Sequence, residues 1–119
     1  MSETLTKVAT IKKLEIIIRP SKLDAVKKAL ATAGYTGVTI SQAEGHGNQK
    51  GSTHATGFKM DMMSKLRLEI VVPESDVEKM IEAVSAAAKT GEPGDGKIFI
   101  TDVQEVIRIR TGERGTKAL

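Results

Sequence analysis

The sequence predicts an α+β domain in which two helices cover one face of an antiparallel sheet. The first observation is an internal repeat: LEIIIRPSKLDAVKKAL at residues 14–30 and LEIVVPESDVEKMIEAV at residues 68–84 share a strand, a proline and an amphipathic helix. The second is that each repeat is followed by a further strand-like run, at residues 38–43 and 97–101. Two such β-α-β units give the order βαββαβ, which is the ferredoxin-like plan.

The first unit begins with KKLEIIIR at residues 12–19, a run rich in β-branched residues that stops at Pro20. Ser21 is typical of a helix N-cap, and Asp24 completes a variant of the capping box. VTISQA at residues 38–43 alternates apolar and polar residues, which predicts a half-buried strand. Between cap and strand, apolar residues at helical spacing and a terminating glycine predict a helix, at Leu23, Val26, Leu30, Ala33 and Gly34.

The second unit starts at residues 65–72, where KLRLEIVV predicts a strand that a proline closes. Glu74 and Ser75 are expected to open the second helix, since both precede an apolar run of helical period. A short strand is predicted at residues 97–101, and VQEVIRIR at 103–110 is compatible with another. The predicted buried face of this helix and the glycine expected to end it are Val77, Met80, Ile81, Val84, Ala88 and Gly91.

The two units are expected to form a single domain over residues 12–119, because the chain is too short for two cores. Residues 1–11 are polar at their start and without period, which indicates a flexible leader. In the ferredoxin-like plan the second face of the sheet is open and would expose β-branched residues. Either copies of the chain associate through this face or local polar residues solvate it; we favour association.

Composition excludes several classes of function. The 119 residues carry a net charge of only +3, with mixed signs, and include two Phe, one Tyr and no Trp, which leaves little for stacking on nucleic-acid bases. There is no cysteine, so a disulfide framework, a thiol nucleophile and a thiolate metal site are excluded. No run is apolar enough to cross a bilayer, and the start lacks the design of a signal peptide. We expect a cytoplasmic protein.

TGEPGDGKIF, which begins at Thr90, concentrates glycine, proline and a lysine between the second helix and its strand. Gly94 and Gly96 lack a Cβ, so this backbone can approach an anion closely and turn N–H groups toward it, while Lys97 adds a mobile cation. The same residues are also ordinary turn formers. Their spacing matches neither a P-loop nor the dinucleotide fingerprint.

Arg108 and Arg110 occupy alternate positions near the end of the chain. In a strand their side chains would share one face, with Ile107 and Ile109 on the other. Two neighbouring guanidinium groups repel each other unless an anion or acid lies between them. The alternatives are a polyphosphate site and a charged edge strand that resists aggregation.

Five stretches in order resemble the PII signal-transduction family: IIIRPSKLDAVKKAL, the GxGxQKG of residues 45–51, KLRLEIVVP, TGEPGDGKIF and VIRIRTGERG. The resemblance covers residues 12–119. It implies a ferredoxin-like subunit in a homotrimer, with adenine nucleotides (ATP or ADP) in clefts between subunits. It also implies that residues 46–64 form the T-loop, which contacts the regulated target protein.

By match to the family's motifs, the resemblance implies three groups of nucleotide-binding residues. The phosphates would lie against the glycine-rich turn and the paired arginines. The base of the T-loop would lie on the other side of the nucleotide. Thr39 and the strand that contains Glu69 and Val71 would hold the adenosine. These residues are Gly94, Asp95, Gly96, Lys97, Arg108 and Arg110; Gly45, Gly47, Asn48 and Gln49; and Thr39, Glu69 and Val71.

The chain departs from the family at the base and body of the T-loop. Asn48 stands where a basic residue usually reaches the terminal phosphate of ATP, so preference for ATP over ADP should be reduced. The T-loop is shorter than usual and has no tyrosine to accept a nucleotidyl group. Target recognition should therefore differ from that of members with the longer loop.

The residues that the resemblance implies for 2-oxoglutarate binding are present, but the departures from the family act against this binding. Family members hold Mg²⁺ between ATP phosphates, the glutamine matching Gln49 and 2-oxoglutarate, while the lysine matching Lys65 pairs with a carboxylate. Asn48 and the shortened loop are expected to disturb this arrangement. His46 and His54 lie apart in a polar segment without further Cys or His ligands, so no metal site made by protein alone is expected.

The sequence leaves three classes of function: a regulator, in two versions, an enzyme and a nucleic-acid module. A regulator, with T-loop conformation set by the bound nucleotide, fits best, and a sensor of ATP, ADP and AMP fits the departures. The alternative regulator senses ATP with 2-oxoglutarate to control nitrogen metabolism or an ammonium transporter. We do not expect an enzyme, since no acidic residue stands out as a positioned base and any ATPase would be slow. A nucleic-acid module is disfavoured by the lack of aromatic residues.

Overall fold

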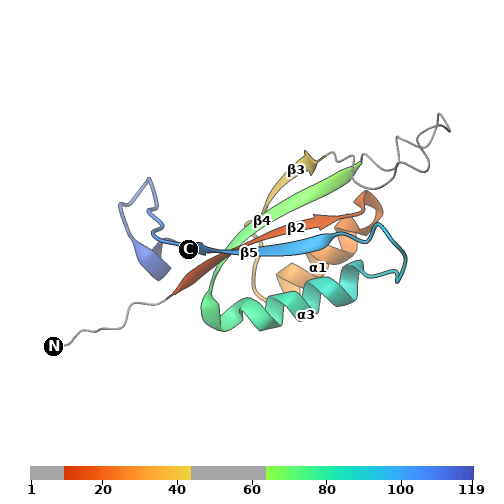
Figure 1. Cartoon of the computed structure of the whole chain (residues 1–119). Coiled ribbons are helices and arrows are strands. Elements are labelled where there is room, and N and C mark those ends of the chain that lie inside the picture. The colour runs from red at the N-terminus through yellow and green to blue at the C-terminus, as the bar shows by residue number, and fades with distance from the viewer. Residues whose placement is uncertain (1–9, 44–63) are drawn as a thin grey trace.

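The computed structural model describes residues 10–43 and 64–119, and these confirm the predicted class and element order. The strands are β2 (Ile11–Ile18), β3 (Thr39–Ala43), β4 (Lys65–Pro73) and β5 (Lys97–Val103). The helices are α1 (Leu23–Thr32) and α3 (Val77–Ala88), with 3-10 turns η1 (Pro20–Lys22), η3 (Glu74–Asp76) and η4 (Gly115–Ala118). All strand pairs are antiparallel in the order β3-β4-β2-β5. Both helices lie on one face of this sheet (Figure 1).

The core lies between the helices and the sheet. Leu14, Ile16 and Ile18 point to the helices from β2, because alternate residues of a strand share a face, and all three are essentially buried. Burying a side chain of this size contributes about 1.5–3 kcal/mol. The other members come from β4, α1 and α3: Val26, Leu30, Leu68, Ile70, Val72, Val77, Met80, Val84 and Ala88.

The internal repeat is a structural repeat, but its helices do not begin as predicted. Ser21 is not an N-cap: it lies in η1, Lys22 precedes α1, and no side chain caps that helix. In the second unit, Glu74 and Ser75 belong to the corresponding turn η3, and α3 begins at Val77. At the end of each strand a proline disfavours helical backbone in the residue before it, and a 3-10 turn then precedes the α-helix.

The ends of the two helices differ. Gly34 follows α1 with φ of +100°, and Tyr35 N donates to the Leu30 carbonyl, as predicted for a glycine-terminated helix. By contrast, α3 stops at Ala88, before Gly91, because Lys89 is already extended.

The Tyr35 hydroxyl also donates to Asp76 at the start of α3, and burial together with this bond raises the pKa of Tyr35 to about 12.

The open face of the sheet is more polar than expected. Glu15 and Glu69 are direct partners across β2 and β4, which is unfavourable for like charges. Each is offset by a diagonal cation, with Arg67 Nε 2.8 Å from Glu15 and Lys13 Nζ 3.5 Å from Glu69. The prediction that this face is apolar is therefore wrong for most of the sheet. Side chains alternate between the two faces of a strand, and most apolar residues of β2 and β4 lie on the face that the helices cover.

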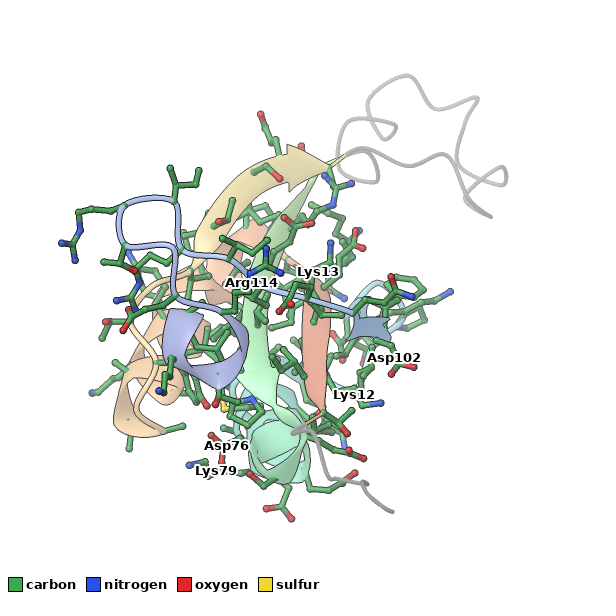
Figure 2. All side chains as sticks on the ribbon, turned by 90° about the vertical axis from the view of Figure 1, so that its left-hand side faces the viewer. Lys12, Lys13, Asp76, Lys79, Asp102 and Arg114 are labelled. Carbon is green, nitrogen blue, oxygen red and sulfur yellow. The ribbon has the colours of Figure 1, made fainter. Side chains whose placement is uncertain are left out.

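Residues 104–119 form an arm that leaves the sheet after β5 (Figure 1). The strand considered for residues 103–110 is not present beyond Val103. The chain instead turns back on itself, with Gly112 N donating to the Arg108 carbonyl and an isolated bridge between Ile107 and Arg114. Within residues 10–43 and 64–119 no strand lies beside residues 104–110 for them to pair with, and an isolated strand is not stable in water. At the same end of the sheet, Lys12 and Asp102 form an ion pair, while Asp76 and Lys79 pair beside α3 (Figure 2).

Candidate functional site

The glycine loop, which we define as residues 90–96, connects α3 to β5. Its three glycines all adopt positive φ: Gly91 at +91°, Gly94 at +101° and Gly96 at +107°. Only glycine adopts these values without strain. The loop begins in an extended conformation after α3 and returns to the sheet edge at Lys97. Its shape therefore depends on its glycines and on the contacts made by its one aspartate.

Asp95 organises the glycine loop. Its carboxylate accepts hydrogen bonds from Thr90 N at 2.8 Å, from Gly91 N at 2.9 Å and from the Thr90 hydroxyl. Arg19 Nε completes the set at 3.1 Å. The Thr90 hydroxyl, followed by the backbone donors and Arg19, holds the pKa of Asp95 well below its usual range. Asp95, predicted to touch nucleotide, has its carboxylate occupied by the protein's own donors.

Gly96 is the point of closest backbone approach. A Cβ built on it would lie 1.7 Å from the Ile17 carbonyl oxygen and 2.7 Å from the carbonyl carbon. Only a residue without a Cβ therefore allows the loop to join β5 beside β2 here. This contact fixes where β5 begins and so where Lys97 stands.

Lys97 and Lys65 meet at one hollow on the open face of the sheet. This lysine hollow has a volume of ≈ 440 Å³. Within residues 10–43 and 64–119, neither lysine has an ion-pair partner, whereas Arg67 is bound to Glu15. The hollow thus holds an excess of positive charge, which favours an anion. Its lining residues are Glu15, Ile17, Ala43, Lys65, Arg67, Gly96, Lys97 and Phe99.

A second hollow of ≈ 360 Å³ lies behind the glycine loop, on the helix side of β2 and β5. Its walls are mainly apolar, with Ile18 and Ile98 from the sheet and Val84 from α3. Asp95, Gly96 and Lys97 also line it. The glycine loop therefore borders a charged hollow on one side and an apolar hollow on the other.

The two predicted arginines lie at the opposite end of the sheet from the glycine loop (Figure 1). β5 runs from Lys97 to Val103, and at about 3.3 Å per residue this separates the two ends by roughly 20 Å. Arg108 binds Glu113 at 3.1 Å and the Leu119 carbonyl at 2.9 Å, so it also shapes the arm. A single chain therefore does not bring Lys97 and these arginines to one anion.

The remaining predicted residues fall in two groups. Thr39 and Glu69 are direct partners across β3 and β4, and Val71 lies two residues further along the same face. The Glu69 carboxylate is engaged by Lys13. The residues predicted at the base of the T-loop, and the two histidines, lie outside the described part of the chain: Gly45, His46, Gly47, Asn48, Gln49 and His54.

Sequence reasoning missed the functional candidates Arg19, Glu15, Arg67 and Phe99. Arg19 precedes a proline in an ordinary strand end, and no local pattern connects it with a loop 76 positions away. In residues 10–43 and 64–119, no three His, Asp or Glu side chains are grouped so that they could hold a metal ion. No helix in the same ranges has the length and apolarity of a membrane span.

Comparison with known proteins gives a consistent result. A family model described as "Nitrogen regulatory protein P-II" matches residues 11–113. The chain is 50% identical over 112 residues to the nitrogen regulatory protein P-II of Nostoc punctiforme, an alignment that covers 92% of this chain and 100% of the relative. The corresponding protein of Azospirillum brasilense is 49% identical over 112 residues, with the same coverage of both chains.

Two solved structures are also similar. Arabidopsis thaliana PII bound to citrate superposes with a TM-score of 0.76 at 38% identity, covering 97% of this chain and 94% of the other. The B. subtilis GlnK–ATP complex superposes with a TM-score of 0.79 at 35% identity, covering 96% and 100%. Both alignments span nearly the whole of each chain.

Proposed function

The chain belongs to the family of nitrogen regulatory P-II proteins, and on that premise we propose that it binds adenine nucleotides in clefts between its copies and thereby controls a target protein. The observation that carries this proposal is the lysine hollow beside Gly96. Two lysines without ion-pair partners in the described residues face one hollow there, next to a backbone that only glycine can form. Such a site suits a polyphosphate. In support, one solved relative is a complex with ATP and another is bound to citrate, and both ligands are polyanions.

The nucleotide cleft is proposed to be shared between copies in a homotrimer. Lys97 and the arginines of the arm lie at opposite ends of the sheet in one copy. Two copies placed head to tail would therefore bring them to one ligand. The arm carries the most exposed large apolar side chain of the described residues, Ile109 at 98%, and Ile107 beside it is 49% exposed. Exposed isoleucines on a projecting arm favour a docked partner. A head-to-tail contact that closes on itself forms a ring of this kind.

The two strand ends that flank the predicted T-loop line the same hollow. Ala43 at the end of β3 and Lys65 at the start of β4 are direct strand partners, and both line the lysine hollow. The strand ends on either side of residues 44–64 therefore lie beside the proposed phosphates. A nucleotide that contacts these two strand ends differently as ATP or ADP would bias the conformations of the segment between them. A protein that changes the conformation of a loop in response to a bound nucleotide acts as a regulator rather than as an enzyme.

We propose that the regulator reports adenylate energy state. Asn48 supplies no charge for a terminal phosphate, so the chain should discriminate weakly between ATP and ADP on affinity alone. AMP would be a further competitor. The alternative effector is 2-oxoglutarate with Mg²⁺ and ATP, for which Lys65 in the lysine hollow and Gln49 are the candidate contacts. The regulated protein is proposed to meet the T-loop, as an enzyme, a transporter or a transcription factor.

Calorimetric titration of the wild-type protein and of Lys97→Ala tests the nucleotide site. We expect the wild-type protein to bind ATP and ADP with similar affinity, and Lys97→Ala to bind both about 10- to 100-fold more weakly, because a charge-assisted hydrogen bond contributes about 1.5–3 kcal/mol. Titrations with AMP, and with ATP plus Mg²⁺ and 2-oxoglutarate, assign the effectors. Lys27→Ala removes an exposed cation from α1 and should leave the affinities unchanged.

Two results would contradict this account. The first is a wild-type protein that binds no adenine nucleotide. The second is equal weakening by Lys97→Ala and Lys27→Ala, which would reduce the role of Lys97 to general surface charge. A wild-type preference for ATP of tenfold or more would contradict only the role given to Asn48.

A further inference from the structure

We propose that Arg19 is a positioning residue for the glycine loop, which it holds through Asp95 in the conformation that receives phosphate. This inference rests on the proposed nucleotide site. It adds a residue that lies on a different connection of the fold, between β2 and α1, and that makes no contact of its own with the lysine hollow.

The contacts of Arg19 join two separate parts of the fold. Arg19 Nε donates to Asp95 at 3.1 Å, and an Nη2 hydrogen bond reaches the Pro93 carbonyl at 2.8 Å. A planar guanidinium that binds two acceptors at once fixes direction as well as distance. The side chains of Arg19 and Asp95 are 31% and 25% exposed, so both are largely sheltered from competing water. The β2–α1 connection thus holds the glycine loop at two points.

Asp95 transmits this hold to the start of the loop. Its second carboxylate oxygen accepts from the backbone N–H groups of Thr90 and Gly91. The loop is therefore closed into a ring from residue 90 to residue 95, and Arg19 ties the ring to the end of β2. The next residue, Gly96, packs against the Ile17 carbonyl, two residues before Arg19. One short stretch, from Ile17 at the end of β2 to Arg19 just after it, therefore determines where the loop and Lys97 lie.

Arg19 also offsets a charge that would oppose an anion. Asp95 lies directly before the Gly96 and Lys97 pair that lines the lysine hollow. An unpaired carboxylate there would repel phosphate, because like charges a few ångströms apart repel strongly away from bulk water. Arg19 supplies the opposite charge from the side of β2. It also packs on Gly94, where a built Cβ would lie 3.2 Å from Arg19 Nη2, so this face of the loop is occupied by the guanidinium.

The test compares Arg19→Gln with Lys12→Gln. Both changes remove a cation that forms an ion pair: Arg19 directly after β2, and Lys12 within β2, where it binds Asp102 at the other end of the sheet. We expect Arg19→Gln to weaken ATP binding about tenfold, which corresponds to about 1.4 kcal/mol, and Lys12→Gln to leave it within twofold. Arg19→Lys should recover part of the loss, because it restores charge but not the two-point fork.

Amide hydrogen exchange shows whether the effect is local. In Arg19→Gln without ligand, the Thr90 and Gly91 amides should exchange at least about tenfold faster, while amides of the β2–β4 pairing keep their wild-type rates. In an Asp95→Asn background, Arg19→Gln should weaken ATP binding little further, because the proposal routes the effect of Arg19 on the loop through Asp95.

Unchanged ATP affinity in Arg19→Gln would overturn the inference while the proposed function stood. So would additive losses from Arg19→Gln and Asp95→Asn, or equal acceleration of exchange in the glycine loop and in the β2–β4 pairing, which would show general destabilisation. A wild-type protein that binds no nucleotide would instead contradict the proposed function, and the inference with it. Titration of wild-type protein therefore separates the two failures.

Discussion

Gly96→Ala is expected to lower the free energy of unfolding by more than about 4 kcal/mol, a loss that few single substitutions cause. The new Cβ would lie 1.7 Å from the Ile17 carbonyl oxygen and 3.3 Å from Ile18 Cα, so β5 must move away from β2. A positive φ of +107° adds backbone strain of about 1–2 kcal/mol for any residue with a Cβ. Urea unfolding at fixed protein concentration measures the loss, and thermal unfolding should show a Tm lower by about 15 °C or more.

Gly91→Ala is the matched control for this substitution. Gly91 has φ of +91°, close to that of Gly96, but a Cβ built there meets no atom within 4 Å. Its substitution should therefore cost only the backbone strain, about 1–2 kcal/mol. If Gly96→Ala and Gly91→Ala destabilise the protein equally, the close approach to Ile17 is not what positions β5 and Lys97.

Ile109→Asp is expected to prevent assembly and, with it, tight nucleotide binding. Ile109 is 98% exposed in the single chain, so the substitution should change the stability of that chain by no more than about 0.5 kcal/mol. In the proposed assembly the arm docks on a neighbouring copy, and burying an unpaired carboxylate there costs several kcal/mol. Analytical ultracentrifugation should show monomers, and calorimetry should show ATP affinity at least about 100-fold weaker.

Thr36→Asp introduces the same charge at an exposed position before β3 and serves as the control. It should leave both assembly and ATP affinity unchanged. An Ile109→Asp protein that keeps the wild-type mass and ATP affinity would show that the arm is not the contact between copies. The separation of Lys97 from Arg108 and Arg110 would then need another explanation.

The fold was largely predictable because the repeat imposes one pattern twice. In both units a strand with every second residue apolar precedes an amphipathic helix, so Leu14 and Leu68 occupy corresponding places in the core. The start of the first helix was not predictable from Ser21, because the 3-10 turn after Pro20 takes up the residues that a cap would use. The strand considered for residues 103–110 failed for a different reason: strand formation depends on a partner, which the pattern of one segment does not reveal.

The candidate site was predictable only in part. Lys97 and Gly96 stand out in the sequence because a lysine and glycines are adjacent, and Lys65 enters through the family motif. No sequence motif indicates Arg19, because its role depends on a contact with Asp95, 76 positions away. The role of Asp95 itself differs from expectation: a motif shows that an acidic residue is present, but not that three donors of its own loop surround it.

The central claim, that one nucleotide cleft is built from two copies, is tested most directly by mixing two inactive variants. Lys97→Ala lacks one half of the proposed cleft, and the double variant Arg108→Ala/Arg110→Ala lacks the other. Each alone should bind ATP weakly. After the two are unfolded together and refolded in equal amounts, about one quarter of the clefts should pair an intact lysine half with an intact arginine half and recover wild-type affinity. Calorimetry counts these sites. If refolded mixtures that assemble normally recover no high-affinity sites, both halves of the cleft come from one chain and the account is contradicted.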